Sequence, residues 1–186
     1  MSRFVYVIIP LLFVLLASAR SPAQAVPLAS SLALAANGSD SISGDYRLVG
    51  GQPTVRRAID EVCNRLDVFA RLFARPILER RNPAYRRVLL DVRSSSARFS
   101  YDGWGPNELP LSGETRTLRG ESGEQVTASQ QVRGNRLVQM FRTPEGWRRN
   151  VIVAHPDGRM TIHTRIESPR LPVPLVYELH YRRVGG

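Results

Sequence analysis

The stretch PDGRMTIHTRIESPRLPVPLVYELHYRR, from Pro156 to Arg183, alternates apolar and polar residues on both sides of a proline-rich corner. A period of two is typical of strands that bury one face of a sheet. Three prolines lie between Ser168 and Leu175 and cannot donate ladder hydrogen bonds, so we expect an extended connection there, with pairing resuming near Leu175. In the last strand we expect Leu175, Tyr177, Leu179 and Tyr181 to face the core, and Glu178, His180 and Arg182 to face water.

The same period of two runs through most of the chain after Ala84. Connections such as TPEG at Thr143–Gly146 and HPDG at His155–Gly158 carry turn chemistry, because proline fixes φ and glycine accepts a positive φ. Short connections predict sequential antiparallel neighbours, so the predicted fold is mainly β with one N-terminal helix: a strongly curved antiparallel meander, or a lipocalin-like barrel, of about seven or eight strands. The inward faces of the earlier strands are expected to carry Val88, Leu90 and Val92; Ala97, Phe99 and Tyr101; Val126, Ala128, Gln130 and Val132; and Met160, Ile162, Thr164 and Ile166.

The segment from Pro53 to about Arg81 has a helical period instead. Pro53 suits the first position of a helix, where its missing N–H costs nothing. Pro76 removes one helical hydrogen bond, so we expect a kink or break beside it, and Asn82-Pro83 is expected to end the helical region. One apolar stripe is predicted, made of Val55, Ile59, Val62, Leu66, Phe69, Phe73 and Ile77. Its part from Val55 to Phe69 is expected to pack onto the sheet.

Two stretches resemble a known group of proteins. PDGRMTIHTRIESPRLPVPLVYELHYRR, together with FARPILERRNPAYRRV at Phe73–Val88, is similar to sequences of exported, uncharacterised bacterial proteins with lipocalin-like β-meanders. The resemblance covers most of the chain beyond the N-terminal segment, and it implies a fold only, with no functional residue carried over. The Gly-x-Trp motif of the first lipocalin strand is absent, and the nearest match to it in this chain is Gly44-Asp45-Tyr46.

Residues 1–25 have the three-part layout of a cleaved signal peptide. One charge at Arg3 precedes the apolar core VYVIIPLLFVLLASA, and small-x-small sites end at Ala19 and Ala25. We expect cleavage after Ala25, with Ala19 as the second choice. The alternative is a transmembrane anchor, which needs about 20 apolar residues in a row and is disfavoured by Pro10. Residues 26–44 are predicted to be a disordered spacer, and residues 45–186 a single helix-plus-β-meander domain. Because of this signal peptide we expect the protein in the periplasm or outside the cell. A lipid anchor is not expected, since no cysteine lies at either cleavage site.

The chain has a formal net charge of +10, and all 26 of its basic residues are arginines. Such a surplus attracts polyanions over a Debye length. Outside the cytoplasm the expected partner is an anionic membrane surface or an acidic envelope glycan, and no nucleic acid is expected; the alternative is a merely solvated basic surface. Cys63 is the only cysteine, which excludes an internal disulfide and two-cysteine metal or redox motifs, and we expect it to fill a buried position.

No catalytic or metal-binding motif stands out in the chain. The histidines lack metal-ligand spacing; His163 and His180 can approach each other if the last two strands pair, and the alternative is two separate surface histidines. Asp60, Glu61 and Asp67 lie among arginines at helical spacing, which favours local ion pairs over acid–base catalysis. Gly-x-Ser-x-Gly, Ser-x-x-Lys and His-Glu-x-x-His are absent. We therefore expect a protein that is not an enzyme and needs no metal or cofactor.

Aromatic and polar side chains on the predicted strands indicate a ligand-binding site rather than a catalytic one. Small barrels are filled by side chains, whereas slightly wider barrels hold one ligand, and a filled core is the alternative here. Gln130 and Thr164 on otherwise apolar faces favour a lined pocket, since a solid core would have to satisfy their hydrogen bonds. The candidate ligand-binding residues are Phe99, Tyr101, Gln130, Phe141, Trp147, Thr164, Tyr177 and Tyr181.

Three functions remain, in order of preference. The first is an exported, non-enzymatic binding protein that holds a hydrophobic or amphipathic ligand, such as a lipid or fatty acid, in its curved sheet. The second is a ligand-free envelope scaffold or interaction domain with a filled barrel. The third is a small isomerase- or hydratase-like enzyme on a cone-shaped fold. That enzyme needs a carboxylate or histidine inside the cone, and Asp91, Asp102 and His163 are not expected to face inward.

Overall fold

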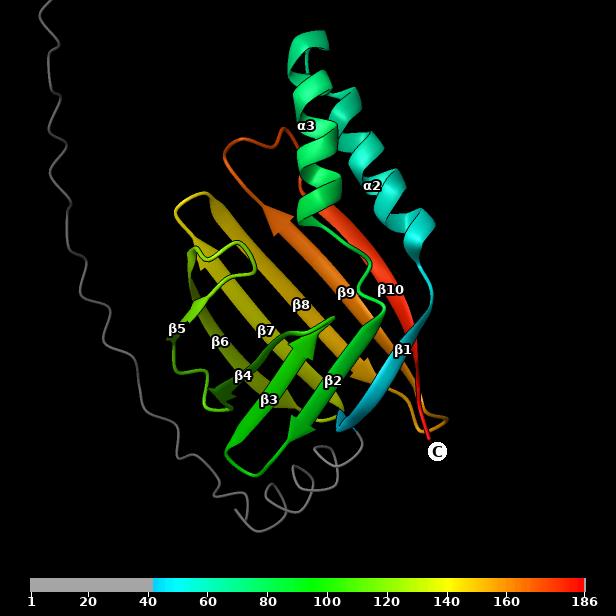
Figure 1. The fold of residues 1–186 in the computed structure, drawn as a ribbon, viewed down its shortest axis with the longest axis vertical. Helices are drawn as coiled ribbons and strands as arrows, with labels where there is room; N and C mark the ends of the chain where they lie inside the picture. The colour runs from blue at the N-terminus through cyan, green and yellow to red at the C-terminus, as the bar shows by residue number, and fades with distance from the viewer. Residues whose placement is uncertain (1–41, 186) are drawn as a thin grey trace, which may run out of the picture.

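The computed structural model describes residues 42–185; the predicted signal peptide and nearly all of the predicted spacer lie outside these residues. Within them, ten strands form one antiparallel sheet in the order β4-β3-β2-β1-β10-β9-β8-β7-β6-β5. The sheet curls into a nearly closed barrel with two helices at one end (Figure 1). The strands are β1 (Gly44–Gly50), β2 (Arg87–Val92), β3 (Ser96–Tyr101), β4 (Trp104–Pro110), β5 (Arg116–Arg119), β6 (Gln125–Arg133), β7 (Arg136–Thr143), β8 (Gly146–Ala154), β9 (Arg159–Glu167) and β10 (Leu175–Arg183).

The expected number of strands, seven or eight, is wrong, because the described barrel has ten. Three strands show too little alternation to be recognised from the sequence: β1 begins and ends with glycine, β4 contains two prolines, and β5 has four residues. These three segments form strands because they pair with neighbouring strands: β1 lies between β2 and β10, β4 pairs with β3, and β5 pairs with β6. Strand formation at these places depends on the partner backbone more than on the local side-chain pattern.

The last strand follows the predicted register. β10 begins at Leu175, directly after the proline-rich connection, and pairs with β9 as far as Arg182. Its four alternate apolar side chains are buried, while His180 and Arg182 are exposed and Glu178 is half-buried. The predicted inward faces of β2, β3, β6 and β9 are likewise buried or packed against the core, so these predictions are confirmed.

The helical region consists of two helices, α2 (Gln52–Asn64) and α3 (Val68–Arg81), so the prediction of a single helix is wrong. The chain breaks between them because Asp67 caps a second helix: its carboxylate accepts a hydrogen bond from the Ala70 N–H at 2.9 Å. Arg71 donates to the carbonyl oxygen of Cys63 at 2.9 Å, which satisfies a backbone acceptor at the end of α2. The expected break at Pro76 is therefore misplaced, since Pro76 lies inside α3.

Only α2 buries its part of the predicted apolar stripe. Val55, Ile59 and Val62 are buried, and so is Cys63, which confirms the buried position expected for that cysteine. No side chain of α3 is buried, and Phe69 is 77% exposed, so the expected packing of Phe69 onto the sheet is wrong. Apolar side chains at helical spacing share one face only as long as the helix is continuous. The turn between α2 and α3 therefore gives the second half of the stripe a different direction from the first.

The N-terminal end of α2 is attached to the barrel wall. Gly51 has a φ of 102°, and a Cβ at this position would collide with the carbonyl oxygen of Glu178 on β10. The Thr54 hydroxyl lies 2.7 Å from the same carbonyl oxygen. This close approach of two backbones requires glycine, and it fixes the start of α2 against β10. Neither helix in residues 42–185 is both long enough and apolar enough to cross a membrane.

Candidate ligand-binding site

Arg148 lies on the inward face of the barrel wall. Asn150 and Ile152 of β8 are buried at alternate positions, and Arg148 precedes them in the same phase. The Arg148 Nη2 group donates hydrogen bonds to the Asn82 side-chain oxygen at 2.6 Å and to the Arg81 carbonyl oxygen at 3.2 Å. Arg148 is therefore half-buried at the place where β8 meets the C-terminal end of α3.

No carboxylate balances the charge of Arg148. It takes part in none of the ion pairs within residues 42–185, and its main electrostatic neighbours are Tyr177, Tyr85 and Tyr101. A guanidinium that is partly removed from water without an anionic partner loses solvation energy that no ion pair restores. Its fork of N–H donors matches a carboxylate, so Arg148 is a candidate binding group for the anionic part of a ligand.

Tyrosine hydroxyls surround this part of the interior. The rings of Tyr85 and Tyr101 stack with their centroids 5.0 Å apart, and Tyr101 donates to the Gln139 side-chain oxygen at 2.6 Å. Tyr181 is fully buried, and its hydroxyl has no hydrogen-bond partner among the described residues. Burial raises the pKa of Tyr85, Tyr101 and Tyr181 well above the usual range for tyrosine. Tyr101 and Tyr85 donate their protons to Gln139 and Glu121, so among these three hydroxyls only that of Tyr181 keeps a proton for another acceptor.

These tyrosine pKa shifts predict a loss of stability at alkaline pH. In the unfolded chain a tyrosine ionises near its usual pKa of 10.0, whereas burial keeps Tyr101 and Tyr181 protonated in the fold. Above about pH 10 the folded state then binds more protons than the unfolded state, so the free energy of unfolding falls by up to about 1.4 kcal/mol per pH unit for each such tyrosine. Urea titrations between about pH 8 and pH 11.5 measure this slope, and Tyr101→Phe is expected to reduce it; an unchanged slope in that variant contradicts the prediction.

Gln130, one of the predicted contact residues, joins two parts of the barrel. Its Nε2 group donates to the carbonyl oxygens of Ala97 on β3 and Leu109 on β4, both at 2.7 Å. Its Oε1 atom accepts a hydrogen bond from Gln139 Nε2 at 3.3 Å. Because Gln130 is on β6, these bonds cross the seam where the edge strands β4 and β5 do not pair. The hydrogen bonds of this buried amide are therefore satisfied by the protein itself.

An apolar wall stands beside the same seam. Phe99 lies edge-on to Trp104, with ring centroids 5.8 Å apart, and to Phe141, with ring centroids 5.9 Å apart. Trp104 Nε1 donates to the Arg119 carbonyl oxygen at 3.0 Å, which links β4 to β5. Edge-to-face aromatic contacts of this kind provide a large, rigid apolar surface.

The structure brings together all but one of the candidate ligand-binding residues. Trp147 is the exception: it lies on the outward face of β8, because Arg148, Asn150 and Ile152 occupy the inward face. It lines a groove of about 540 Å³ between the β7–β8 turn and the β9–β10 connection, together with Leu171 and Val173. The others are buried on inward faces: Phe99, Tyr101, Gln130, Phe141, Thr164, Tyr177 and Tyr181.

Sequence reasoning missed Arg148 and Gln139. A signal for Arg148 was present, since in GWRRNVIVA it shares the phase of Asn150 and Ile152. An arginine in a basic chain is normally interpreted as solvent-facing. Only the pairing of β8 with β7 and β9 shows that this phase is the inward one.

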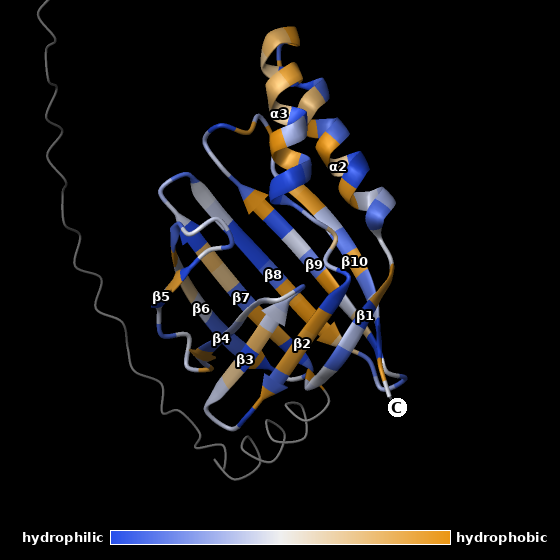
Figure 2. Ribbon diagram, viewed as in Figure 1, coloured by the Kyte–Doolittle hydropathy of each residue, from blue (hydrophilic) through white to orange (hydrophobic). Residues whose placement is uncertain are grey.

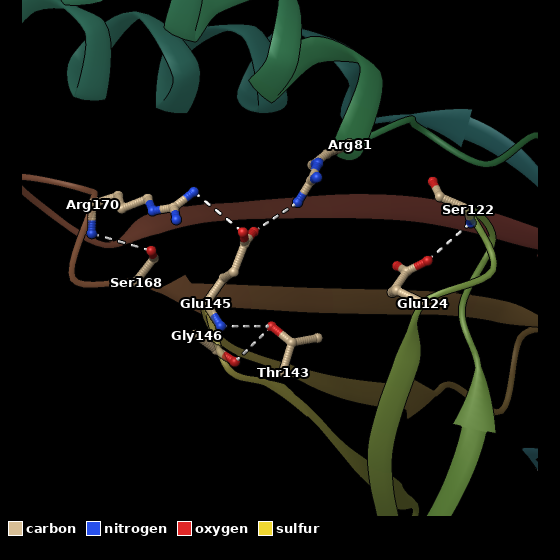
Figure 3. Close-up of polar contacts among 8 residues, drawn as sticks. All are labelled: Arg81, Ser122, Glu124, Thr143, Glu145, Gly146, Ser168 and Arg170. Carbon is tan, nitrogen blue, oxygen red and sulfur yellow. Dashed lines mark hydrogen bonds and ion pairs between the residues drawn. The ribbon is translucent and has the colours of Figure 1, made fainter.

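The two helices form a lid over one end of the barrel, and polar contacts hold the C-terminal end of α3 to neighbouring turns. Figure 3 shows Glu145, in the β7–β8 turn, accepting hydrogen bonds from Arg81 at 3.1 Å and from Arg170 at 3.2 Å. Tyr85, which follows α3, donates to Glu121 in the β5–β6 turn at 2.7 Å. Each of these exposed contacts contributes little to stability. The half-buried bonds from Arg148 to Asn82 and to the Arg81 carbonyl oxygen hold the same end of α3.

The histidines of the last two strands meet at one carboxylate. Glu178 lies 2.7 Å from His163 Nδ1 and 3.3 Å from His180 Nε2. All three are on the outer face of the β9–β10 pair, and Asp91 and Asp102 are exposed as well. In residues 42–185, no group of three or more His, Cys, Asp or Glu side chains is placed to hold a metal ion.

Comparison with solved structures gives the fold. A "REP1-NXSQ fatty acid transporter" is similar over 79% of this chain and 98% of its own, at 13% identity and a TM-score of 0.50. The zebrafish ileal bile acid-binding protein complexed with cholic acid is similar over 77% of this chain and 99% of its own, at 7% identity and a TM-score of 0.50. The fatty-acid-binding protein of Manduca sexta is similar over 76% of this chain and 98% of its own, at 14% identity and a TM-score of 0.50.

At these identities the likeness shows the fold alone. The chain folds as a fatty-acid-binding-protein-like barrel, which agrees with the lipocalin-like barrel expected from the sequence. No family model and no curated protein sequence matches the chain. Any function must therefore be argued from the residues of the barrel wall.

Proposed function

We propose that this protein is a non-enzymatic binding protein that holds an amphipathic molecule with an acidic head, such as a fatty acid, inside its barrel. The observation that carries the proposal is Arg148, an inward-facing guanidinium with no carboxylate partner among the described residues. The fold supports it, because similar solved structures include proteins named for fatty acids and bile acids. We also propose that the protein acts after export, on the basis of the signal-peptide layout of residues 1–25.

Each part of such a ligand has matching chemistry in the barrel wall. A carboxylate accepts charge-assisted hydrogen bonds from Arg148. The buried Tyr181 hydroxyl, which has no partner among the described residues, is suited to donate to a ligand or to a bound water. The hydrocarbon part packs against apolar side chains such as Phe99 and Phe141, where each buried methylene contributes about 0.8 kcal/mol. In this arrangement the tail supplies most of the affinity and Arg148 sets the orientation.

A ligand-free scaffold is the second candidate function, and one observation favours it. The chain of hydrogen bonds from Tyr101 through Gln139 to Gln130 is complete in the protein alone. A satisfied polar network makes a filled barrel rigid without any bound molecule. In that case Arg148 has a structural role and holds Asn82 at the end of α3.

The test is native mass spectrometry of the protein purified from its own host, followed by titration of the delipidated protein with a fluorescent long-chain fatty acid. We expect a co-purified amphipathic acid, or saturable binding of the probe that unlabelled fatty acid displaces. Bile acids and long-chain alcohols compared as competitors then define which tail and head are accepted. If no molecule co-purifies and no probe is displaced, the binding function is wrong and the scaffold remains.

A further inference from the structure

α3 presents a continuous apolar stripe to solvent. Val68, Phe69, Leu72, Phe73 and Ile77 are 69%, 77%, 66%, 72% and 43% exposed. Their helical spacing puts them on one side of α3, and Figure 2 shows the end of this helix that lies farthest from the barrel in apolar colours. A contiguous exposed patch of large apolar side chains marks an interaction surface rather than an ordinary protein surface.

The surroundings of this stripe are basic. α3 carries four arginines and one carboxylate, Glu79. Arg80 follows Ile77 by three residues and Phe73 by seven, so it lies on the same side of the helix, and it forms no ion pair within residues 42–185. Docking of two copies through α3 would bring these like charges together, in a chain whose net charge is +10. An anionic lipid surface complements both the apolar stripe and the arginines.

We propose that α3 docks on an anionic lipid surface. The stripe from Val68 to Ile77 enters the boundary between the head groups and the acyl chains, with the helix lying in the plane of the surface, and Arg80 contacts lipid phosphates. Because α3 is part of the lid, docking holds that end of the barrel against the lipid. This interaction surface lies on the outside of the molecule, so it does not depend on a ligand inside the barrel.

The test is co-sedimentation of the exported protein with vesicles of phosphatidylcholine alone, or of phosphatidylcholine with about one third phosphatidylglycerol. We expect binding to the anionic vesicles that weakens as the salt concentration rises, and little binding to the neutral ones. Replacing Phe69→Ser and Phe73→Ser together is expected to weaken binding at least tenfold, roughly the effect of removing two apolar anchors. Val176→Ser is the control, because Val176 is an exposed apolar residue (54%) on β10 and does not belong to the α3 stripe, and this variant is expected to bind like the wild type.

Equal vesicle binding by the wild type and the double variant overturns the proposal, and so does equal binding to neutral and anionic vesicles. If the wild type sediments as a dimer and the double variant as a monomer, with no vesicle binding by either, the stripe pairs with a second copy and the lipid proposal is wrong. The fluorescent fatty acid is expected to bind both proteins equally, because Phe69 and Phe73 are exposed and take no part in the buried core of the barrel. A failure of lipid docking is therefore distinguishable from a failure of the proposed ligand binding.

Discussion

Replacing Arg148→Met is expected to weaken the binding of a long-chain fatty acid roughly 10- to 100-fold, while the corresponding fatty alcohol binds within about twofold of its wild-type affinity. Hydrogen bonds to a charged group contribute about 1.5–3 kcal/mol, and the alcohol shares the tail but lacks the charge. Methionine keeps an unbranched apolar side chain that replaces the arginine stem, so the packing around that stem changes little. Displacement of a fluorescent fatty acid by each competitor measures both affinities.

Arg149→Met is the matched control for this substitution. Arg149 is the next residue of β8 and is exposed on the opposite face, so its replacement removes the same charge from the molecule as a whole. Urea unfolding of both variants reports any loss that follows from the broken contact between Arg148 and Asn82. If Arg148→Met weakens the acid and the alcohol alike, or if both variants weaken the acid equally, Arg148 does not bind the acidic head.

Replacing Ile59→Ala is expected to lower the free energy of unfolding by roughly 2–5 kcal/mol. Ile59 is 2% exposed, and α2, which carries it, contacts β10, so the truncation leaves a cavity between helix and barrel. Phe69→Ala is expected to change the free energy of unfolding by less than about 0.5 kcal/mol, because its ring is already 77% exposed. Urea titrations followed by circular dichroism measure both values.

The comparison between these two variants tests the orientation of α3. Ile59 and Phe69 belong to the same predicted apolar stripe, and a single continuous helix would give both a large effect. A loss of several kcal/mol for Phe69→Ala therefore contradicts the exposed orientation of α3. A small loss for Ile59→Ala contradicts the attachment of α2 to the barrel.

The inward face of strands such as β10 could be predicted from the sequence, because with a period of two only one of the two alternating sets of side chains is apolar enough to be buried. On β10, a shift by one residue would bury Glu178 and His180 and expose Tyr177 and Tyr181, so the burial of apolar surface decides the phase. The same argument placed Tyr101 and Gln130 on the inward face. It needs no knowledge of the neighbouring strands.

The orientation of α3 could not be predicted in this way. Phe69 continues the spacing of the α2 stripe, so the sequence pattern alone favours one buried face. The cap at Asp67 and the bond from Arg71 to the Cys63 carbonyl oxygen end that continuity. Once the helix turns, the position of α3 relative to the barrel decides which side chains meet water, and no local pattern contains that information.

The sequence by itself therefore determined the β-rich fold class, the inward faces of β2, β3, β6, β9 and β10 and the position of most inward-facing aromatic residues, whereas the inward face of β8 was decided by its pairing with β7 and β9. The tertiary structure alone decided where the polar interior residues find their partners. Gln130 bonds to Ala97, 33 residues away, and Arg148 bonds to Asn82, 66 residues away. Periodicity records which face of an element is apolar, because burial of apolar surface is non-directional. Hydrogen bonds and ion pairs need specific atoms within about 3 Å of each other, and for residues distant in sequence only the folded barrel brings those atoms together.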